Sequence, residues 1–494
     1  MSPNPPTRDD PTVAGASEVI GGPVGRHAAG PMWSWMTPVR VALGLTILCC
    51  LFGYLQKAQC LTHPYVDNYQ YTRLCYSDTY VLYTVEGLNA RTDQNGAVTG
   101  SVGVPYRDHP VEYPPVLGGL MWVAGEITSA VHGGGPDTGG RHATTFFNVT
   151  ALGLATFALI STFTVARLAG RARAWDAVMV AASPVLFMHA FTNWDLAAVA
   201  FTGLGLYAWS RGSPAWAGAA LGLGIATKLY PLLVLLALVM LCARARKWRP
   251  AVKAVAAGAA AVVIAYIPAI VLSHQTPRAI YNSRFVFPQG CGTGHPLRGW
   301  RWFSSLSQIR GADWGSPWLV LQHVFSGNAI GRAFSPAAQC GTAPFKTNVI
   351  ASLAVALFVV GVGVLVWRAP WRPRVGQIAF LLVAGFVMLN KIDSPQYALW
   401  LVPLAVLARP RWASLLIWQV TEVVLGAANL YTLIAQGSPQ QGLPMDTYLV
   451  VLVFRDIVLA WLMALVVREV LDPRRDIVRN DGVDDPAGGV LVAS

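Results

Sequence analysis

Apolar runs recur from residue 39 to residue 467 of the chain, and short polar breaks separate them. Each run either approaches the roughly 20 residues that cross a bilayer or forms half of a closely spaced pair. Only 12% of the 494 residues are charged, whereas a soluble chain of this length carries about a quarter. The sequence therefore predicts an all-α polytopic membrane protein.

Basic residues predict how the chain is oriented in the membrane. Five of the short breaks are rich in Lys and Arg, and such loops lie in the cytoplasm under the positive-inside rule. They are residues 167–173, 210–212, 244–249, 368–374 and 409–411. The same rule accounts for the net charge of +12, so nucleic acid is not expected as a partner.

The apolar stretch 116–131 is decided by the loops that follow it. If it crossed the membrane, all five basic loops would lie outside, whereas an interfacial helix on the outer surface leaves all five inside. The second arrangement is expected, and it leaves about twelve transmembrane helices. They are predicted at 39–56, 143–166, 175–191, 195–210, 215–227, 229–243, 251–272, 347–367, 375–389, 397–408, 412–431 and 447–467.

Five segments follow from this arrangement. Residues 1–38 are expected to be a disordered cytoplasmic tail, because they are rich in Pro, Gly and polar residues up to residue 31. Residues 39–470 form the transmembrane domain, and residues 471–494 form a second cytoplasmic tail. Two long extracytoplasmic loops, 57–142 and 273–346, are rich in Tyr, Trp, Pro and Gly, which favours folded, functional loops.

Four of the seven cysteines fall in the two long loops. An even number on an oxidising face indicates the disulfides Cys60–Cys75 and Cys291–Cys340, with four free thiols as the alternative. No Cys or His spacing matches a zinc site.

Carboxylates near the outer ends of helices are the first candidates for chemistry. Asp78 follows the first span among aromatic residues, where it can act as a general base toward a sugar hydroxyl or be a solvated loop acid. Asp195, after Asn193, can reach the same cavity or can cap the helix that it starts. Glu112 and Tyr113 open the interfacial helix, and a capping role is the alternative for Glu112.

Cations at outer helix ends are candidates for binding an anionic phosphate. Lys228 interrupts an apolar stretch at the tip of a broken hairpin, and an ionisable group at such depth is usually functional. A polar loop between two later spans offers Lys391, Gln396 and Tyr397. The second long loop adds three candidates that can instead be ordinary loop charges, namely Arg284, His295 and Arg298. Glu422, Arg455 and Asp456 lie inside spans, where a structural pairing across helices is favoured.

Several of these blocks together resemble glycosyltransferase family 87, the polyprenyl-phosphate-mannose-dependent α-mannosyltransferases of the GT-C fold. The resemblance covers residues 40 to 470. The blocks, in family order, are Tyr76-Ser-Asp78, Pro105-Tyr106, Glu112-Tyr-Pro-Pro115, Asn193-Trp-Asp195, Lys228-Leu-Tyr-Pro231 and Asn390-Lys391 with Ser394-Pro-Gln396-Tyr397. The GT-C fold implies a catalytic base in the first outer loop, which maps onto Asp78, and a second acidic outer loop, which maps onto Asp195.

The resemblance implies a membrane glycosyltransferase of the cell membrane with an extracytoplasmic active site. The expected donor is a polyprenyl-phosphate sugar, with mannose as the sugar, and the expected acceptor is a glycolipid or cell-envelope glycan. Membrane lipid is a further expected partner. No cofactor or metal is expected, because a basic clamp can stabilise the leaving phosphate. The rival interpretation is a lipid or small-molecule transporter or flippase, which usually places ionisable groups at the midplane of repeated halves.

Overall fold

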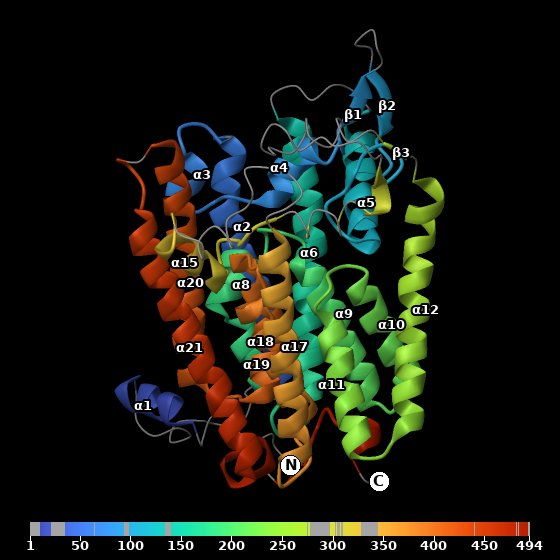
Figure 1. Cartoon of the computed structure of the whole chain (residues 1–494). Coiled ribbons are helices and arrows are strands. Elements are labelled where there is room, and N and C mark those ends of the chain that lie inside the picture. The colour runs from blue at the N-terminus through green and yellow to red at the C-terminus, as the bar shows by residue number, and fades with distance from the viewer. Residues whose placement is uncertain are drawn as a thin grey trace.

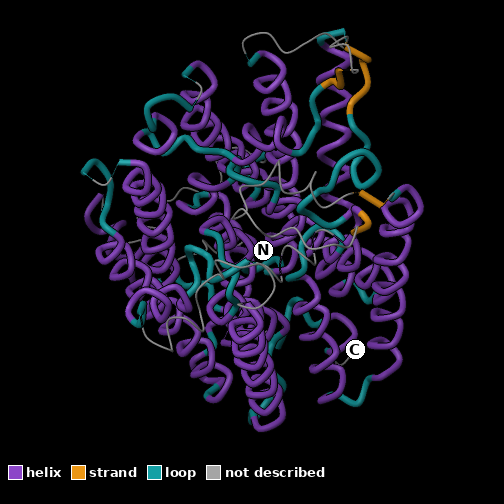
Figure 2. Tube along the Cα trace, turned by 45° about the horizontal axis from the view of Figure 1, so that its top comes forward, coloured by secondary structure: helices purple, strands orange, loops and turns teal. Residues whose placement is uncertain are grey.

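A computed structural model describes residues 10–20, 35–63, 65–92, 98–133, 140–273, 275–276, 297–301, 303, 307, 310–327, 344–438, 440–480, 482 and 484–492. Helices dominate these residues, and the short strands lie together near one end (Figures 1 and 2). We call this end the loop end. The opposite end, which carries α1 (Pro11–Ile20), is called the terminus end.

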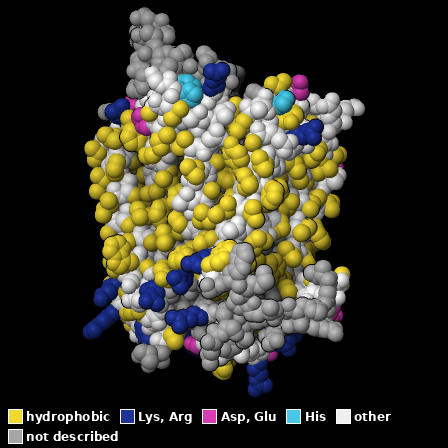
Figure 3. Space-filling model, turned by 180° about the vertical axis from the view of Figure 1, so that it is seen from behind, with side chains coloured by type: hydrophobic (Ala, Val, Ile, Leu, Met, Phe, Trp, Pro, Cys, Tyr) yellow, Lys and Arg dark blue, Asp and Glu magenta, His cyan; other side chains and the backbone are white. Residues whose placement is uncertain are grey.

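Six helices of the described chain are long and apolar enough to cross a membrane. On the face seen from behind, hydrophobic side chains form a broad band across the middle of the molecule (Figure 3). The predicted all-α polytopic membrane fold is therefore confirmed. The six helices are α2 (Pro38–Thr62), α6 (Arg141–Leu168), α12 (Trp248–Leu272), α17 (Pro344–Arg368), α20 (Trp412–Gly437) and α21 (Met445–Leu471).

The other six predicted spans form shorter helices. The span predicted at 175–191 is broken, because Pro184 cannot continue a helix and Ser183 caps a new one by accepting a hydrogen bond from the Leu186 amide at 3.1 Å. The shorter elements are η1 (Ala174–Ala177), α7 (Val178–Ala181), α8 (Pro184–His189), α9 (Asp195–Ser210), α10 (Pro214–Ile225), α11 (Pro231–Arg244), α18 (Val375–Leu389), η3 (Pro395–Tyr397) and α19 (Ala398–Ala408).

Small residues let these helices approach closely, as is common in membrane proteins. A Cβ atom on Gly218 of α10 would lie 2.0 Å from the Ala254 carbonyl oxygen of α12, so a side chain there would force the two helices apart. Helices α18 and α19 are almost entirely buried, and the segment that joins them reaches the loop end. This packing places the polar segment 390–396 between two buried helices.

The first long loop folds into short elements at the loop end. After α3 (Tyr69–Thr72) and α4 (Asp78–Val85), the strands β1 (Ala90–Thr92) and β2 (Val98–Val102) pair antiparallel, with Ala90 opposite Val102. Helix α5 (Pro115–Val131) follows beside the outer part of α6 and corresponds to the predicted interfacial helix. The second long loop contributes β3 (Gln275–Thr276), β4 (Leu297–Arg298), η2 (Gly299–Arg301) and α15 (Pro317–Val324).

Both terminal segments contain short helices, although residues 1–38 were expected to be disordered. Residues 11–20 form α1, and the carboxylate of Asp10 accepts a hydrogen bond from the Trp412 amide at 3.0 Å. The other terminus forms three short elements at the terminus end of the molecule, namely η4 (Pro473–Arg475), α22 (Ile477–Asn480) and η5 (Gly489–Leu491). The Trp209 indole donates to the Gly488 carbonyl at 3.0 Å. Specific polar contacts at long sequence separation hold these segments, and composition does not reveal such contacts.

Candidate functional site

A cavity of about 390 Å³ opens at the loop end between segments that lie far apart in the sequence. It is bounded by the start of α4, the residues before α5, the turn before α9, the link between α10 and α11, residue 310 and its neighbours, and the segment 390–400. Its lining includes eight charged, amide or phenol side chains, namely Asp78, Glu112, Tyr113, Asn193, Lys228, Arg310, Asp313 and Tyr397.

Asp78 is held firmly at the wall of this cavity. Its amide donates to the Thr192 carbonyl at 2.8 Å, which joins α4 to the turn before α9. One carboxylate oxygen accepts a hydrogen bond from the Tyr76 hydroxyl at 2.8 Å, and the other accepts one from the Asn193 side-chain amide at 2.7 Å. The nearby Asp78 charge and burial raise the pKa of Tyr76 well above its ordinary value, so the phenol stays protonated and donates. The carboxylate is therefore fixed in orientation and still lines open space.

Asn193 connects Asp78 to the cation of the site. Its amide nitrogen also donates to the Tyr113 hydroxyl at 2.9 Å, and its oxygen accepts from the Lys228 ammonium at 3.3 Å. That ammonium lies 4.7 Å from the centre of the Tyr113 ring and 5.7 Å from that of Tyr397. Two aromatic faces and a neutral amide lie on the cavity side of this ammonium, and the Asp195 carboxylate lies 3.5 Å from it, so it remains available to an anion in the cavity.

Asp195 was predicted either to reach the cavity or to cap the helix that it starts. It begins α9, is fully buried and is not among the residues that line the cavity. One oxygen accepts from the Trp400 indole at 2.8 Å and lies 3.5 Å from the Lys228 ammonium. Asp195 is the first residue of α9, so the start of this helix fixes where the carboxylate lies. Its position suits holding Lys228 and Trp400 in place.

Glu112 and Arg310 form an ion pair across the cavity mouth, with Arg310 Nη2 3.0 Å from Glu112 Oε2. Burial raises the pKa of Glu112, while the Arg310 charge opposes that rise. Arg310 is about half exposed and lines the cavity. The contact brings the first long loop against the second. Sequence reasoning named Glu112 but missed Arg310, because nothing in the loop pattern distinguished it from its neighbours.

The segment between α18 and α19 supplies the opposite wall. Gln396 and Tyr397 line the cavity, and the Tyr397 ring stacks on Trp400 at 3.8 Å between ring centres. Lys391, also predicted, is buried behind the wall and donates to the Arg310 carbonyl. Burial and the nearby Arg310 charge lower the pKa of Lys391 from 10.5 to about 8. It therefore supports the position of Arg310.

Asp313 is a second cavity residue that sequence reasoning missed. Its amide donates to the Lys391 carbonyl at 2.8 Å, and its side chain accepts from the Ser394 hydroxyl at 3.3 Å. Burial raises the pKa of its carboxyl group, which the Arg310 charge partly offsets. The cavity wall therefore carries the carboxylates of Asp78, Glu112 and Asp313 together with the cations of Lys228 and Arg310.

Other predicted residues fall outside this arrangement. Arg284, His295, Cys291 and Cys340 lie outside the described residues, and of Arg298 the structure describes only the backbone, which lies in β4. Cys60 and Cys75 form a disulfide with Cα atoms 5.7 Å apart, which ties the end of α2 to the segment before Asp78. In the described part of the chain, no group of three His, Cys, Asp or Glu side chains is arranged to hold a metal ion.

Comparison with known proteins shows the family to which the chain belongs. The family model described as glycosyltransferase family 87 matches residues 136–390, which is just over half of the chain. Comparison with curated proteins gave no match. The matched region contains the turn with Asn193, the Lys228 link and Asp313, and it ends at the segment after α18. The resemblance drawn from short motifs is thereby confirmed, and the transporter alternative loses its support. The chain belongs to glycosyltransferase family 87 and is a membrane glycosyltransferase.

Proposed function

We propose that the protein transfers mannose from a polyprenyl monophosphate donor to a hydroxyl group of a glycolipid or cell-envelope glycan. The observation that carries the proposal is the bridge through Asn193, which holds a carboxylate and a buried ammonium on one cavity wall. The Asp78–Asn193 contact is 2.7 Å, and the Asn193–Lys228 contact is 3.3 Å. A sugar with a phosphate leaving group requires a base and a cation in this proximity.

In the proposed reaction, Asp78 removes the proton from the acceptor hydroxyl. The acceptor oxygen then forms a bond to the anomeric carbon while the bond from that carbon to the phosphate oxygen breaks, with inversion. The electron pair leaves with polyprenyl phosphate, whose added charge is stabilised by Lys228 and Arg310. Asp78 later returns its proton to water, which restores the enzyme.

Charge distribution supports a cavity that faces the extracytoplasmic side of the cell membrane. In the rear view, many Lys and Arg side chains gather at the terminus end (Figure 3), opposite the end that carries the cavity. Under the positive-inside rule this terminus end is cytoplasmic. A reporter fused after His132, just beyond α5, should therefore read as external, and a cytoplasmic signal there would overturn the orientation.

The donor and acceptor assignment is tested in cells. Mass spectra of cell-envelope glycolipids, recorded with and without this protein, should differ by one hexose on a defined class of molecule. The product should carry an α-linked mannose when the donor is β-linked. Identical glycolipid and glycan profiles in the two strains would contradict the proposed acceptor class.

A further inference from the structure

A second hollow, of about 260 Å³, lies at the terminus end, remote from the cavity that contains Asp78. It lies among the turn before α20, the last turns of α21, and the elements η4 and α22. Five arginines line it, while Glu469 is the one carboxylate among its lining residues. We call these five residues, Arg409, Arg411, Arg468, Arg474 and Arg475, the arginine pocket.

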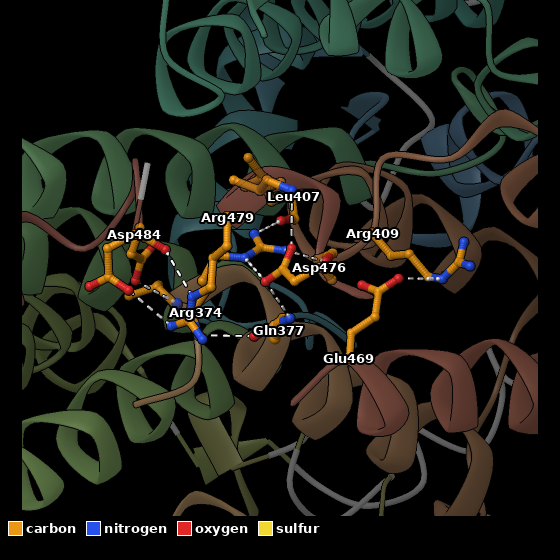
Figure 4. A network of polar contacts seen from close by, with 12 residues as sticks. Arg374, Gln377, Leu407, Arg409, Glu469, Asp476, Arg479 and Asp484 are labelled. Carbon is orange, nitrogen blue, oxygen red and sulfur yellow. Dashed lines mark hydrogen bonds and ion pairs between the residues drawn. The ribbon is translucent and has the colours of Figure 1, made fainter. Parts of the chain in front are cut away.

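A neighbouring arginine, Arg374, has its guanidinium hydrogen-bond donors paired with acceptors of the protein itself. Arg374 binds both carboxylate oxygens of Asp476, at 2.7 and 2.9 Å, and donates to the Leu407 and Ala408 carbonyls at 2.7 Å each. Figure 4 shows this group beside the Arg409–Glu469 pair. The donors of Arg374 are directed at protein acceptors, so it has little capacity left for a ligand.

The arginine pocket has fewer such acceptors: Arg475 pairs with Asp472 at 2.8 Å, and Arg409 donates to the Ser414 hydroxyl at 2.8 Å. Arg409 and Arg411 share Glu469, with Nε–Oε1 distances of 3.0 and 4.0 Å. In the described part of the chain, neither Arg468 nor Arg474 makes a side-chain hydrogen bond or ion pair. Burial lowers the pKa of Arg409; the Glu469 charge opposes this, and the Arg411 charge adds to it. Several guanidinium groups thus face one hollow with donors unused, an arrangement that an anion would stabilise.

An apolar surface leads directly to this hollow along α21. Val450, Phe454, Ile457 and Trp461 recur at helical spacing and are 40% to 69% exposed. Leu465 and then Arg468 continue the same helix face and both line the hollow. A molecule with an anionic head and apolar chains would match this succession, because its chains would follow the exposed stripe toward the bilayer interior. A free phosphate compound would contact only the arginines of the hollow and not the apolar stripe.

We propose that the arginine pocket binds the phosphate headgroup of an anionic phospholipid, whose acyl chains lie along Trp461 and Ile457, within the roughly 15 Å that one leaflet of hydrocarbon spans. Guanidinium groups recognise phosphate oxygens through paired hydrogen bonds, and the low-dielectric edge of the membrane strengthens the attraction. The site lies apart from the cavity that contains Asp78, so its occupancy does not depend on which sugar is transferred.

Lipid retention by the full-length purified protein tests this proposal. The probes are phosphatidylglycerol and phosphatidylcholine, titrated separately in detergent and counted by native mass spectrometry. The variant Arg468→Gln/Arg474→Gln removes two guanidiniums without touching Glu469. Each cation near a lipid headgroup contributes about fivefold in affinity, so the variant should bind phosphatidylglycerol about 30-fold more weakly. Phosphatidylcholine, which has no net charge, should bind more weakly to the unaltered protein and change little in the variant.

The matched control is Arg171→Gln/Arg249→Gln, which removes two exposed arginines of the terminus end that do not line the hollow. It should retain phosphatidylglycerol like the unaltered protein. Equal weakening in both variants would show general charge attraction and overturn the site, as would unchanged retention in the pocket variant. Inorganic phosphate is added in a final arm. Displacement of the lipid at millimolar phosphate would assign the pocket to a free phosphate compound and refute the lipid assignment.

Discussion

Replacing Asp78 with asparagine separates its chemical role from its structural one. The side chain accepts from Tyr76 at 2.8 Å and from Asn193 at 2.7 Å. In Asp78→Asn, the remaining oxygen can still accept from Asn193, while the new amide can donate to the Tyr76 hydroxyl. One hydrogen bond is kept and one is reversed, so we expect a change in folding free energy within about 1 kcal/mol.

The effect on the reaction should be far larger. A positioned general base typically contributes about 100- to 10,000-fold, so turnover should fall by that factor, or about 3 to 5 kcal/mol in activation free energy. The assay is sugar transfer from a synthetic mannosyl polyprenyl phosphate, with donor binding measured separately. Asp67→Asn is the matched control, because Asp67 is an exposed acid of the same loop, with a φ of 51° that asparagine tolerates. Turnover within tenfold of normal in folded Asp78→Asn would refute the base assignment.

Three further predictions concern charged groups around the site. In the protein that folds, Lys228→Met should lose about 100- to 1,000-fold in kcat, because leaving-group stabilisation is lost; an effect on KM alone in steady-state kinetics would contradict this. The variant also leaves the buried Asp195 without its cation, so its folded yield is measured first. Arg455 lies 2.9 Å from Asp393 and 3.9 Å from Glu422, so Arg455→Ala should lose about 3 to 5 kcal/mol of stability and lower the folded yield. Adding Glu422→Gln should restore part of that yield in size-exclusion profiles, and no recovery would count against their pairing. The pKa of Lys391 falls from 10.5 to about 8 on folding, so the unfolded chain binds the extra proton between these values. Stability should therefore rise with pH from about 8 toward 10.5, and the rise should be smaller in Lys391→Gln when thermal unfolding is followed across that range.

The membrane fold could be predicted from sequence because each long apolar run has few ways to satisfy its backbone in lipid. Lys228 was identified for a related reason: placing a charge inside an apolar stretch costs free energy, so such a residue is usually functional. The same rule predicted that Glu422 pairs with Arg455. The closer partner of Arg455 is Asp393, which lies in a loop at the end of a different helix. Pairing between distant segments depends on how helices cross, and residue patterns do not encode that crossing.

The cavity residues that escaped prediction lie in segments without periodicity. Arg310 and Asp313 fall in the second long loop, where motif resemblance was weakest, and tertiary contacts with Glu112 and Lys391 give them their place. Asp195 was named as a site residue, but its side chain is buried and does not line the cavity. A carboxylate at the start of an apolar helix looks exposed in the sequence, and only the stacked Trp400 and Tyr397 rings reveal that it is covered.

Transfer by the purified protein itself tests the central claim most directly. Full-length protein in detergent, without any membrane gradient, is mixed with isotope-labelled mannosyl polyprenyl phosphate and a glycolipid extract from the cell envelope. The account predicts that labelled mannose moves to a glycolipid as an α-linkage while polyprenyl phosphate is released in equal amount. Intact donor after prolonged incubation with folded protein, or label that reaches acceptors equally well with Asp78→Asn, would contradict it.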